Sequence, residues 1–595
     1  MTWLYVAGSS VSTRGAHNKT VPSRVVHLEQ GPVRGYKAPD GDFFVFYGIP
    51  YASAPTGEDR FKAPLPPPVW LQPLEAVDNG IICPQKDYMG VVPKDKKMHE
   101  NCLIATVYVP DTLEDNIPVV VYVHGGGYLI AFGDYVTPRN FAKTKRVILV
   151  TFNYRLAAHG FLCLGTKDVP GNAGMKDQVA LLRWVKKNIA NFGGNPEDVT
   201  LAGYSAGSAA VDTLMLSKMT NGLFNKVIPE SGVSLGAFNI QLDPLENAKR
   251  YARWLNFTNV DDFYALENFY KTASYEVLNS VNSMNSPDTT LIFSPCVERD
   301  VGVERFLEDT PFNILSSGNY QKVPLLYGFA TMEGLFRIPF FEIWKRQMNE
   351  KFSDFLPGDL QFKSKKEKEK IAAKVKQFYF GNKKVSPENV LRYVDYYSDV
   401  LVIYSTLRSL KLLLEAGSDK IYFYEYVHVD ENTMKIPYTK VRGPDHCAQT
   451  WAVLDGLNLT HTNERLISES LKEMKNITRE LWLNFMLTGN PTPEGSSFPK
   501  WPPTGSNAIP HMALDNKLEL RDYFERKLEK RYQFWDGLYK KYYRMPIPPR
   551  PPVGLSSGPN TRRISNITAT LYRQYLMITI IYPNDFFQFY LYINA

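Results

Sequence analysis

The middle of the chain alternates between short apolar runs and longer amphipathic stretches. Residues 118–123 and 147–152 are apolar without alternation, as expected of strands that are buried on both faces of a sheet. Between residues 175 and 190 the apolar positions recur every three or four residues and predict a helix, and the next strand is expected at 198–203. Strand, helix and strand in this order predict an α/β fold with a large, mostly parallel central sheet and helices on both of its faces.

Further elements are expected on both sides of this core. Residues 24–52 alternate and turn like a β-hairpin, with the turn at Asp40-Gly41-Asp42. Long helical patterns cover roughly 340–416 and 464–488. Three more strands and one late helix are expected at 226–228, 323–328, 420–425 and 523–543.

The two ends of the chain differ from its middle. A proline-rich run at 546–552 cannot continue a helix, and the residues after it form only interrupted apolar segments. We therefore expect an N-terminal extension at 1–23, one α/β domain at 24–545, and a Pro-rich, apolar and poorly ordered C-terminal extension at 546–595.

Charge and hydropathy argue against several classes of protein. The chain has 595 residues, with 68 Lys and Arg against 61 Asp and Glu, and its small net charge of +7 argues against a dedicated nucleic-acid binder. The densest charge run, residues 363–370, mixes Lys with Glu and is interpreted as a solvated helix face. No stretch reaches the ~18 consecutive apolar residues of a membrane-spanning helix. The first residues lack the basic and apolar segments of a signal peptide.

The segment Gly203-Tyr204-Ser205-Ala206-Gly207 carries the strongest chemical signal. It is a G-x-S-x-G placed directly after a predicted buried strand and directly before a helical stretch. A nucleophilic serine on such a tight strand-to-helix turn stands clear of the backbone, and the glycines permit the close packing that the turn needs. Without this context the pentapeptide is an ordinary Gly/Ser turn, so the flanking pattern makes Ser205 the candidate nucleophile.

A second glycine-rich segment, His124-Gly125-Gly126-Gly127, follows the strand that ends at Val123. Acyl transfer needs N–H groups that point at the developing oxyanion, and glycines let backbone amides face a pocket without side chains in the way. The amides of Gly126, Gly127 and Ala206 are the candidate oxyanion-hole donors. Alone, the segment also fits a flexible glycine loop; its pairing with the serine turn favours the catalytic interpretation.

A serine nucleophile needs a base and an acid that orients the base. In the order serine, acid, histidine, the base lies after Ser205. That part of the chain holds four histidines: His428, His446, His461 and His511. We select His446, because the turn before it precedes a helical stretch, the kind of loop end that holds catalytic residues. Glu333 is the candidate acid because two residues separate it from a strand end, although a surface glutamate fits this position equally well.

Cysteines and glycosylation motifs bear on the compartment. Five cysteines do not make a disulfide scaffold, but Cys83 and Cys102 are close enough in sequence to close one surface loop; two unrelated thiols are the alternative. The pairing of Cys163, Cys296 and Cys447 is left open. Asn-x-Ser/Thr motifs provide the glycosylation candidates Asn256, Asn458 and Asn476. A disulfide and these motifs favour a secreted protein, whereas the missing leader is compatible with a cytoplasmic one.

Together these segments resemble the type B carboxylesterase family of the α/β-hydrolase fold, which includes cholinesterases and many arthropod esterases. The similarity covers about residues 24–545. Further segments that carry it are Gly48-Ile49-Pro50-Tyr51-Ala52, Arg60-Phe61, Asn153-Tyr154-Arg155, Gly171-Asn172-Ala173-Gly174, Phe192-Gly193-Gly194-Asn195-Pro196 and Thr488-Gly489-Asn490-Pro491. The resemblance implies a Ser205–Glu333–His446 triad, an oxyanion hole at Gly126, Gly127 and Ala206, and a disulfide between Cys83 and Cys102.

The chain departs from the family pattern at three places. Before Cys102 it reads His99-Glu100-Asn101 where Ser-Glu-Asp is usual, which predicts altered polar contacts nearby and a pairing of Glu100 with an arginine. Tyr204 stands where glutamate or glutamine is commoner, including glutamine in juvenile-hormone esterases, and this weakens a hormone-specific assignment. The loop 83–102 has no tryptophan, the residue with which cholinesterases hold a quaternary ammonium, so acetylcholine is not the expected substrate.

The resemblance implies hydrolysis of a small-molecule ester through an acyl-enzyme intermediate on Ser205. No metal or organic cofactor is expected, because the sequence shows no His/Cys cluster at ligand spacing. The rival interpretation is a non-catalytic adhesion or ligand-binding protein on the same fold, and the intact triad argues against it. No oligomeric state is predicted.

Overall fold

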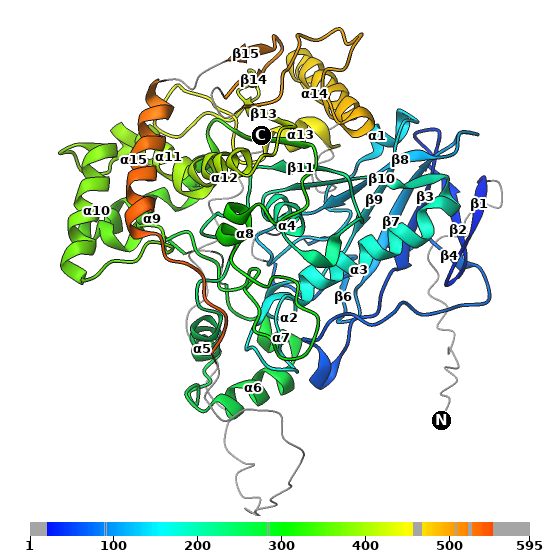
Figure 1. The fold of residues 1–595 in the computed structure, drawn as a ribbon, viewed down its shortest axis with the longest axis horizontal. Coiled ribbons are helices and arrows are strands. Elements are labelled where there is room, and N and C mark those ends of the chain that lie inside the picture. Colours follow the sequence, from blue (N-terminus) through cyan, green and yellow to red (C-terminus); the bar gives the residue numbers. More distant parts are fainter. Residues whose placement is uncertain are drawn as a thin grey trace, which may run out of the picture. The chain divides into compact units, whose positions relative to one another are not determined.

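The structure is a computed structural model that describes residues 21–87, 90, 92–282, 284, 286–455, 467–505, 509–521 and 526–550. The part of the chain that it describes is built on a thirteen-stranded sheet (Figure 1). The order of its strands is β1-β2-β3-β7-β9-β8-β10-β11-β12-β13-β14-β15, with β4 beside β2. Their bounds are β1 Ser23–Leu28, β2 Gly31–Lys37, β3 Phe43–Pro50, β4 Leu74–Glu75, β7 Ile104–Pro110, β8 Ile117–Val123, β9 Ile148–Phe152, β10 Gly194–Tyr204, β11 Lys226–Glu230, β12 Leu325–Ala330, β13 Ile421–Tyr426, β14 His511–Leu514 and β15 Glu519–Arg521. A separate pair joins β5 Ile81–Ile82 to β6 Lys97–Met98.

The centre of the sheet is parallel and its edges are antiparallel. From β9 through β8, β10, β11, β12 and β13 to β14, every neighbouring pair runs parallel. β1, β2, β3 and β7 form an antiparallel meander at one edge, and β15 pairs antiparallel with β14 at the other. The predicted α/β architecture with a mostly parallel central sheet is therefore confirmed. In a parallel sheet, the carboxyl ends of the strands lie along one edge, where ligand-binding loops gather.

Helices cover both faces of this sheet (Figure 1). On one face, Tyr122 of β8 and Tyr204 of β10 belong to the main apolar cluster, together with side chains of α1, α13 and α14. On the other face, α3 and α4 contact β10, and Val121 and Leu201 are fully buried there. The helix bounds are α1 Arg139–Lys143, α2 Ala157–Phe161, α3 Ala173–Asn188, α4 Ala206–Leu214, α5 Pro244–Trp254, α6 Phe263–Thr272, α7 Tyr275–Leu278, α8 Pro311–Ser317, α9 Phe341–Glu350, α10 Lys365–Phe380, α11 Val390–Ser398, α12 Tyr404–Glu415, α13 Ala448–Val453, α14 Glu469–Thr488 and α15 Arg526–Tyr542.

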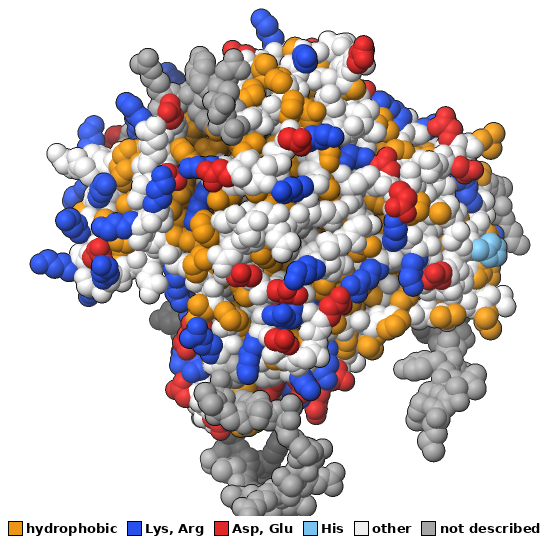
Figure 2. All heavy atoms as spheres, viewed as in Figure 1, with side chains coloured by type: hydrophobic (Ala, Val, Ile, Leu, Met, Phe, Trp, Pro, Cys, Tyr) orange, Lys and Arg blue, Asp and Glu red, His pale blue; other side chains and the backbone are white. Residues whose placement is uncertain are grey.

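Local sequence explains where the long helices begin and end. Ser468 caps α14 by accepting the N–H of Leu471 at 3.0 Å, and Gly489 ends the helix with φ +73°. Ser364 caps α10 in the same way through the N–H of Glu367. The charge run 363–370 lies at the start of α10, as predicted, and Lys and Arg side chains stand out over α10 at one edge of the molecule (Figure 2).

Three sequence predictions for the fold are corrected. Residues 24–52 form three strands rather than a hairpin, because a second turn lies before Gly31, whose φ of +138° suits glycine. The helical pattern 340–416 is divided into α9 to α12, with 3₁₀ and π turns at some of the junctions. The strand β7 between β3 and β9, the strands β14 and β15, and the two-residue strands β4, β5 and β6 were not predicted.

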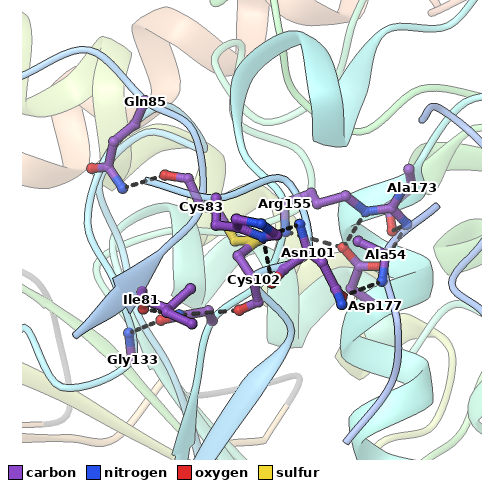
Figure 3. Close-up of a disulfide and its surroundings, with 12 residues drawn as sticks. Ala54, Ile81, Cys83, Gln85, Asn101, Cys102, Gly133, Arg155, Ala173 and Asp177 are labelled. Atoms are coloured by element: carbon purple, nitrogen blue, oxygen red, sulfur yellow. Dashed lines mark hydrogen bonds and ion pairs between the residues drawn. A yellow bond between two sulfur atoms is a disulfide. The ribbon is translucent and has the colours of Figure 1, made fainter. Parts of the chain in front are cut away.

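Two disulfides join distant parts of the described chain. Cys83 pairs with Cys102, the pair that the resemblance implied, and Cys163 pairs with Cys296, whereas Cys447 is a free, buried thiol. In Figure 3 the first disulfide lies beside Asn101 and the buried ion pair of Arg155 with Asp177.

Asn101 and Glu100, the two residues before Cys102, both make polar contacts. Asn101 Oδ1 accepts the N–H of Ala54 at 2.9 Å. Glu100 pairs with Arg60 at 3.1 Å, as expected.

The chain ends lie largely outside the described residues. Residues 1–20 and 551–595, which include most of the two predicted extensions, are not described. The first described strand begins at Ser23 and the last described helix ends at Tyr542. Among the helices of the described residues, none combines the length and the hydropathy that crossing a membrane requires.

Candidate active site

Ser205 lies on the sharp turn between β10 and α4. Its backbone adopts φ +56° and ψ −124°, a strained conformation for a residue with a side chain. Its N–H donates to the carbonyl oxygen of Glu230 at 2.9 Å. A Cβ on Gly207 would lie 2.2 Å from the carbonyl oxygen of Val123, and one on Gly203 would lie 2.5 Å from that of Gly207. The two glycines of the G-x-S-x-G segment are therefore required by close backbone contacts.

The segment His124–Gly127 follows β8 and packs against the serine turn. A Cβ on Gly125 would lie 2.7 Å from the carbonyl oxygen of Tyr204. Gly126 and Gly127 adopt φ +96° and +63°, which few other residues tolerate. Within the described residues, no group accepts a hydrogen bond from the amides of Gly126, Gly127 or Ala206. These three N–H groups are available to an oxyanion.

His124 fixes this segment rather than acting as a base. Its ring stacks on Tyr154 with 4.3 Å between centroids, and its Nδ1 donates to the carbonyl oxygen of Gly125 at 2.9 Å. Tyr154 OH donates to the carbonyl oxygen of His124 at 3.0 Å. Burial lowers the pKa of His124 to about 4, so its imidazole is neutral at physiological pH.

His446 joins Ser205 to Glu333. The hydroxyl of Ser205 donates to His446 Nε2 at 2.8 Å, and His446 Nδ1 donates to Glu333 Oε2 at 2.5 Å. Glu333 is fully buried and begins a 3₁₀ helix, Glu333–Phe340, two residues after the end of β12. Its other oxygen, Oε1, accepts the hydroxyl of Ser231 at 2.6 Å and the N–H of Ala330 at 2.8 Å. The carboxylate is thus held by three donors, and the imidazole is held in one tautomer.

Neither of the other two candidate histidines that the structure describes makes a hydrogen bond to the serine. His428 is buried two residues after β13, and its Nδ1 pairs with Asp515 at 2.7 Å. His511 is buried in β14. His461 lies outside the described residues. Within the described part of the chain, the geometry selects His446.

Sequence reasoning missed a group of polar residues behind the triad. Ser231 binds Glu333, and Gln449 Nε2 donates to Ser231 Oγ at 2.6 Å. Glu230 is fully buried beside it. A signal was present, because Glu230-Ser231 follows the predicted strand 226–228 after one residue, at the sheet edge where functional side chains gather.

The residue before the nucleophile lies in the core. Tyr204, the neighbour of Ser205, is 5% exposed and packs between Tyr122 and Trp451, with ring centroids 6.4 Å and 5.7 Å away. Tyr204 therefore belongs to the core, where the family more often has a polar residue.

Comparison with known proteins decides the family. The sequence profile of the carboxylesterase family matches residues 22–535. The chain belongs to the carboxylesterase family. This carboxylesterase is 33% identical to the juvenile hormone esterase of Heliothis virescens over 524 residues, which cover 84% of the chain and 91% of that relative. It is 30% identical to a carboxylic ester hydrolase of Bombus ignitus over 485 residues, which cover 78% of the chain and 85% of that relative.

Solved structures agree with the family. The crystal structure of juvenile hormone esterase from Manduca sexta, with OTFP covalently attached, superposes with a TM-score of 0.77 at 28% identity and covers 87% of this carboxylesterase and 100% of that chain. A PNB esterase structure superposes with a TM-score of 0.67 at 24% identity, which shows the shared fold. The protein is a carboxylic ester hydrolase with the α/β-hydrolase fold, and its family acts on small-molecule esters.

Proposed function

We propose that this carboxylesterase uses Ser205 as nucleophile, His446 as general base and Glu333 as the acid that orients the base. The observation that carries the assignment is the unbroken chain of hydrogen bonds from Ser205 Oγ to His446 Nε2 and from His446 Nδ1 to Glu333 Oε2. A carboxylate on Nδ1 fixes the tautomer whose Nε2 accepts the proton of the serine.

Acylation begins when His446 Nε2 takes the proton of Ser205 Oγ and this oxygen attacks the ester carbonyl. The carbonyl oxygen becomes negative and accepts hydrogen bonds from the amides of Gly126, Gly127 and Ala206. The imidazolium then gives its proton to the leaving alkoxide, the bond to the alcohol oxygen breaks, and the acyl group stays on Ser205. In serine hydrolases the loss of one such donor raises the barrier by about 3–4 kcal/mol.

Deacylation repeats the sequence with water. His446 takes a proton from a water molecule, whose oxygen attacks the acyl carbon. The proton then passes to Ser205 Oγ as the carboxylic acid leaves. Glu333 keeps its hydrogen bond to Nδ1 in both halves and stabilises the imidazolium that forms in each.

Juvenile hormone appears in the names of two of the relatives above. We do not propose it as the substrate of this chain. The residue before the nucleophile is Tyr204, whose ring packs between Tyr122 and Trp451, rather than the glutamine that juvenile-hormone esterases commonly have there. The proposed activity is general carboxylic ester hydrolysis.

We also propose that the protein is secreted. Two disulfides within the described residues support an oxidising compartment. Of the glycosylation candidates, Asn256 is exposed just after α5, and Asn476 is exposed on α14. Asn458 lies outside the described residues. Protein collected from the medium of expressing insect cells should lose mass with an N-glycosidase, and Asn256→Gln should remove part of this loss; exclusive retention in the cytosol would contradict secretion.

The triad is tested by replacing its nucleophile. Ser205→Ala should lower kcat/KM for p-nitrophenyl acetate by about 10³-fold or more, because the hydroxyl that forms the acyl-enzyme is gone. The matched control is Ser208→Ala, which removes a nearby buried hydroxyl that donates to the carbonyl oxygen of Gly232. We expect the control to keep kcat/KM within a few-fold and both variants to unfold cooperatively. A Ser205→Ala variant with the rate of the control would overturn the assignment.

A further inference from the structure

Glu230, the last residue of β11, is a fully buried carboxylate that the proposed mechanism does not use. Its Oε1 accepts hydrogen bonds from Tyr122 OH at 2.8 Å and from Trp482 Nε1 at 3.0 Å. Its Oε2 accepts one from Thr450 Oγ1. The three donors belong to β8, α14 and α13, so a single carboxylate ties the sheet to two helices that pack on it.

Glu230 and its neighbour also contact the proposed triad. The carbonyl oxygen of Glu230 accepts the N–H of Ser205 at 2.9 Å. Ser231 donates to Glu333 Oε1 and accepts from Gln449 Nε2, each at 2.6 Å. The dipeptide Glu230-Ser231 therefore contacts the nucleophile and the acid directly, and it reaches the histidine through α13.

α13 needs such contacts because it is short. It has six residues and begins two residues after His446. Its N-cap residue, Cys447, has φ +65° and makes no side-chain capping bond. A helix of this length is unstable on its own in water, so its position is set by what it packs against and bonds to. Lys475 and Arg479 of α14 donate to backbone carbonyls at the end of α13. At its start, the consecutive residues Gln449 and Thr450 bond to the consecutive residues Ser231 and Glu230.

A purely structural role for Glu230 is the alternative. In that case the carboxylate would only satisfy the buried donors of Tyr122, Trp482 and Thr450. A neutral glutamine side chain also carries an acceptor oxygen and is less costly to bury than a charge. A glutamine has one acceptor oxygen, whereas the two oxygens of Glu230 hold three donors from three elements at once.

We propose that Glu230 is a positioning residue for ester hydrolysis. Its carboxylate holds Thr450 and, through α13, keeps the imidazole of His446 within hydrogen-bond distance of Ser205 Oγ. This inference rests on the proposed function of the triad. Because a misplacement of a reacting group by about 1 Å costs on the order of 10²-fold in rate, a small shift of α13 is enough to lower kcat.

Variants that remove different donors from the same carboxylate separate positioning from stability. Thr450→Val removes the donor on α13 and keeps the size of the side chain, while Thr450→Ser retains the hydroxyl. Tyr122→Phe removes a donor on β8 and leaves α13 in place. For each variant, kcat and KM are measured with a p-nitrophenyl ester, kcat is divided by the number of sites titrated with a fluorophosphonate, and thermal unfolding is recorded.

We expect Thr450→Val to lower kcat per titrated site about tenfold with KM within about twofold, because the loss falls on the geometry of the base. Thr450→Ser should recover most of this loss. Tyr122→Phe should lower the midpoint of unfolding while kcat per site stays within about twofold. Glu230→Gln provides a second variant, and it should lower kcat in the same direction as Thr450→Val.

An unchanged kcat per site in Thr450→Val and Glu230→Gln would overturn the inference. Equal losses of kcat in Thr450→Val and Tyr122→Phe would overturn it as well, since both would then report a general loosening of the fold. A wild-type protein that takes up no fluorophosphonate at Ser205 is a different result: it overturns the proposed triad and this inference with it.

Discussion

The serine and the histidine of the site are held by different physical means. On the serine side, backbone atoms crowd together: Gly207 faces the carbonyl oxygen of Val123, and Ser205 itself adopts a positive φ. On the histidine side, side-chain hydrogen bonds hold a short helix: Thr450 and Gln449 bond its start, and Lys475 and Arg479 bond its end. The first arrangement tolerates no added atoms, whereas the second responds to the loss of individual polar groups.

The largest loss of activity is expected when Glu333, the acid on the histidine side, is replaced. Glu333→Gln keeps the shape of the side chain, but its amide can donate to Nδ1 and leave the proton on Nε2, which then cannot take the proton of the serine. We expect kcat/KM to fall about 10³–10⁴-fold. The matched control is Glu342→Gln, a glutamate on α9 whose side chain is 59% exposed, with an expected change below about twofold. A Glu333→Gln enzyme within tenfold of the wild type would argue that Glu333 does not orient the base.

The serine side is tested by adding a single carbon atom. Gly207→Ala places a Cβ 2.2 Å from the backbone oxygen of Val123, and neither backbone can yield without moving the serine turn. We expect kcat/KM to fall at least about 10²-fold, with lower soluble yield. Gly537→Ala is the control, because nothing lies within 4 Å of its added Cβ in α15, and it should stabilise the protein by about 0.5–1 kcal/mol. Equal behaviour of the two variants would refute the steric account.

The smallest effect is expected on the free energy of unfolding rather than on the rate. It concerns Glu230, the buried carboxylate on the histidine side. Burial raises the pKa of Glu230 from its ordinary value of 4.5 to about 7, although its three hydrogen-bond donors oppose the shift. Between these pH values the folded protein binds more protons than the unfolded chain. The contribution of Glu230 to the free energy of unfolding is therefore full below about pH 4.5 and declines as the pH rises through 7.

The glutamine side chain of the Glu230→Gln variant does not titrate in this pH range. Comparison with this variant therefore isolates the declining contribution of Glu230 to the free energy of unfolding. From pH 4.5 to 8, the wild type should lose on the order of 3 kcal/mol relative to the variant. Urea unfolding of both proteins at several pH values measures this difference. A difference that does not change with pH would show that the carboxyl titrates alike in the folded and unfolded chains.

The sequence was most informative where backbone geometry sets the structure. The G-x-S-x-G and His-Gly-Gly-Gly segments predicted the turn of Ser205 and the amides of Gly126 and Gly127, because glycines at fixed spacing mark close backbone approaches. The apolar runs predicted the parallel centre of the sheet, since strands buried on both faces lack alternation. The strand β7, which lies between β3 and β9, was missed although its residues Ile104–Pro110 include an apolar run.

Long-range side-chain contacts were beyond sequence reasoning. Glu230 bonds to Tyr122 and Trp482, which lie 108 and 252 residues away along the chain. The disulfide between Cys163 and Cys296 spans 133 residues and was left open. Such pairs depend on how the whole sheet places its elements, so local spacing and composition do not specify them. His446 was selected by its place in the chain order and its loop, and the contacts that hold it appeared only in the structure.

The central claim is most directly tested by mapping the residue that reacts. Wild-type protein is treated with a fluorophosphonate, digested, and examined by mass spectrometry alongside Ser205→Ala. We predict one phosphonate group per chain, on Ser205, with concurrent loss of esterase activity and no adduct in the variant. An adduct on another residue, or full labelling of the Ser205→Ala protein, would contradict the proposed triad.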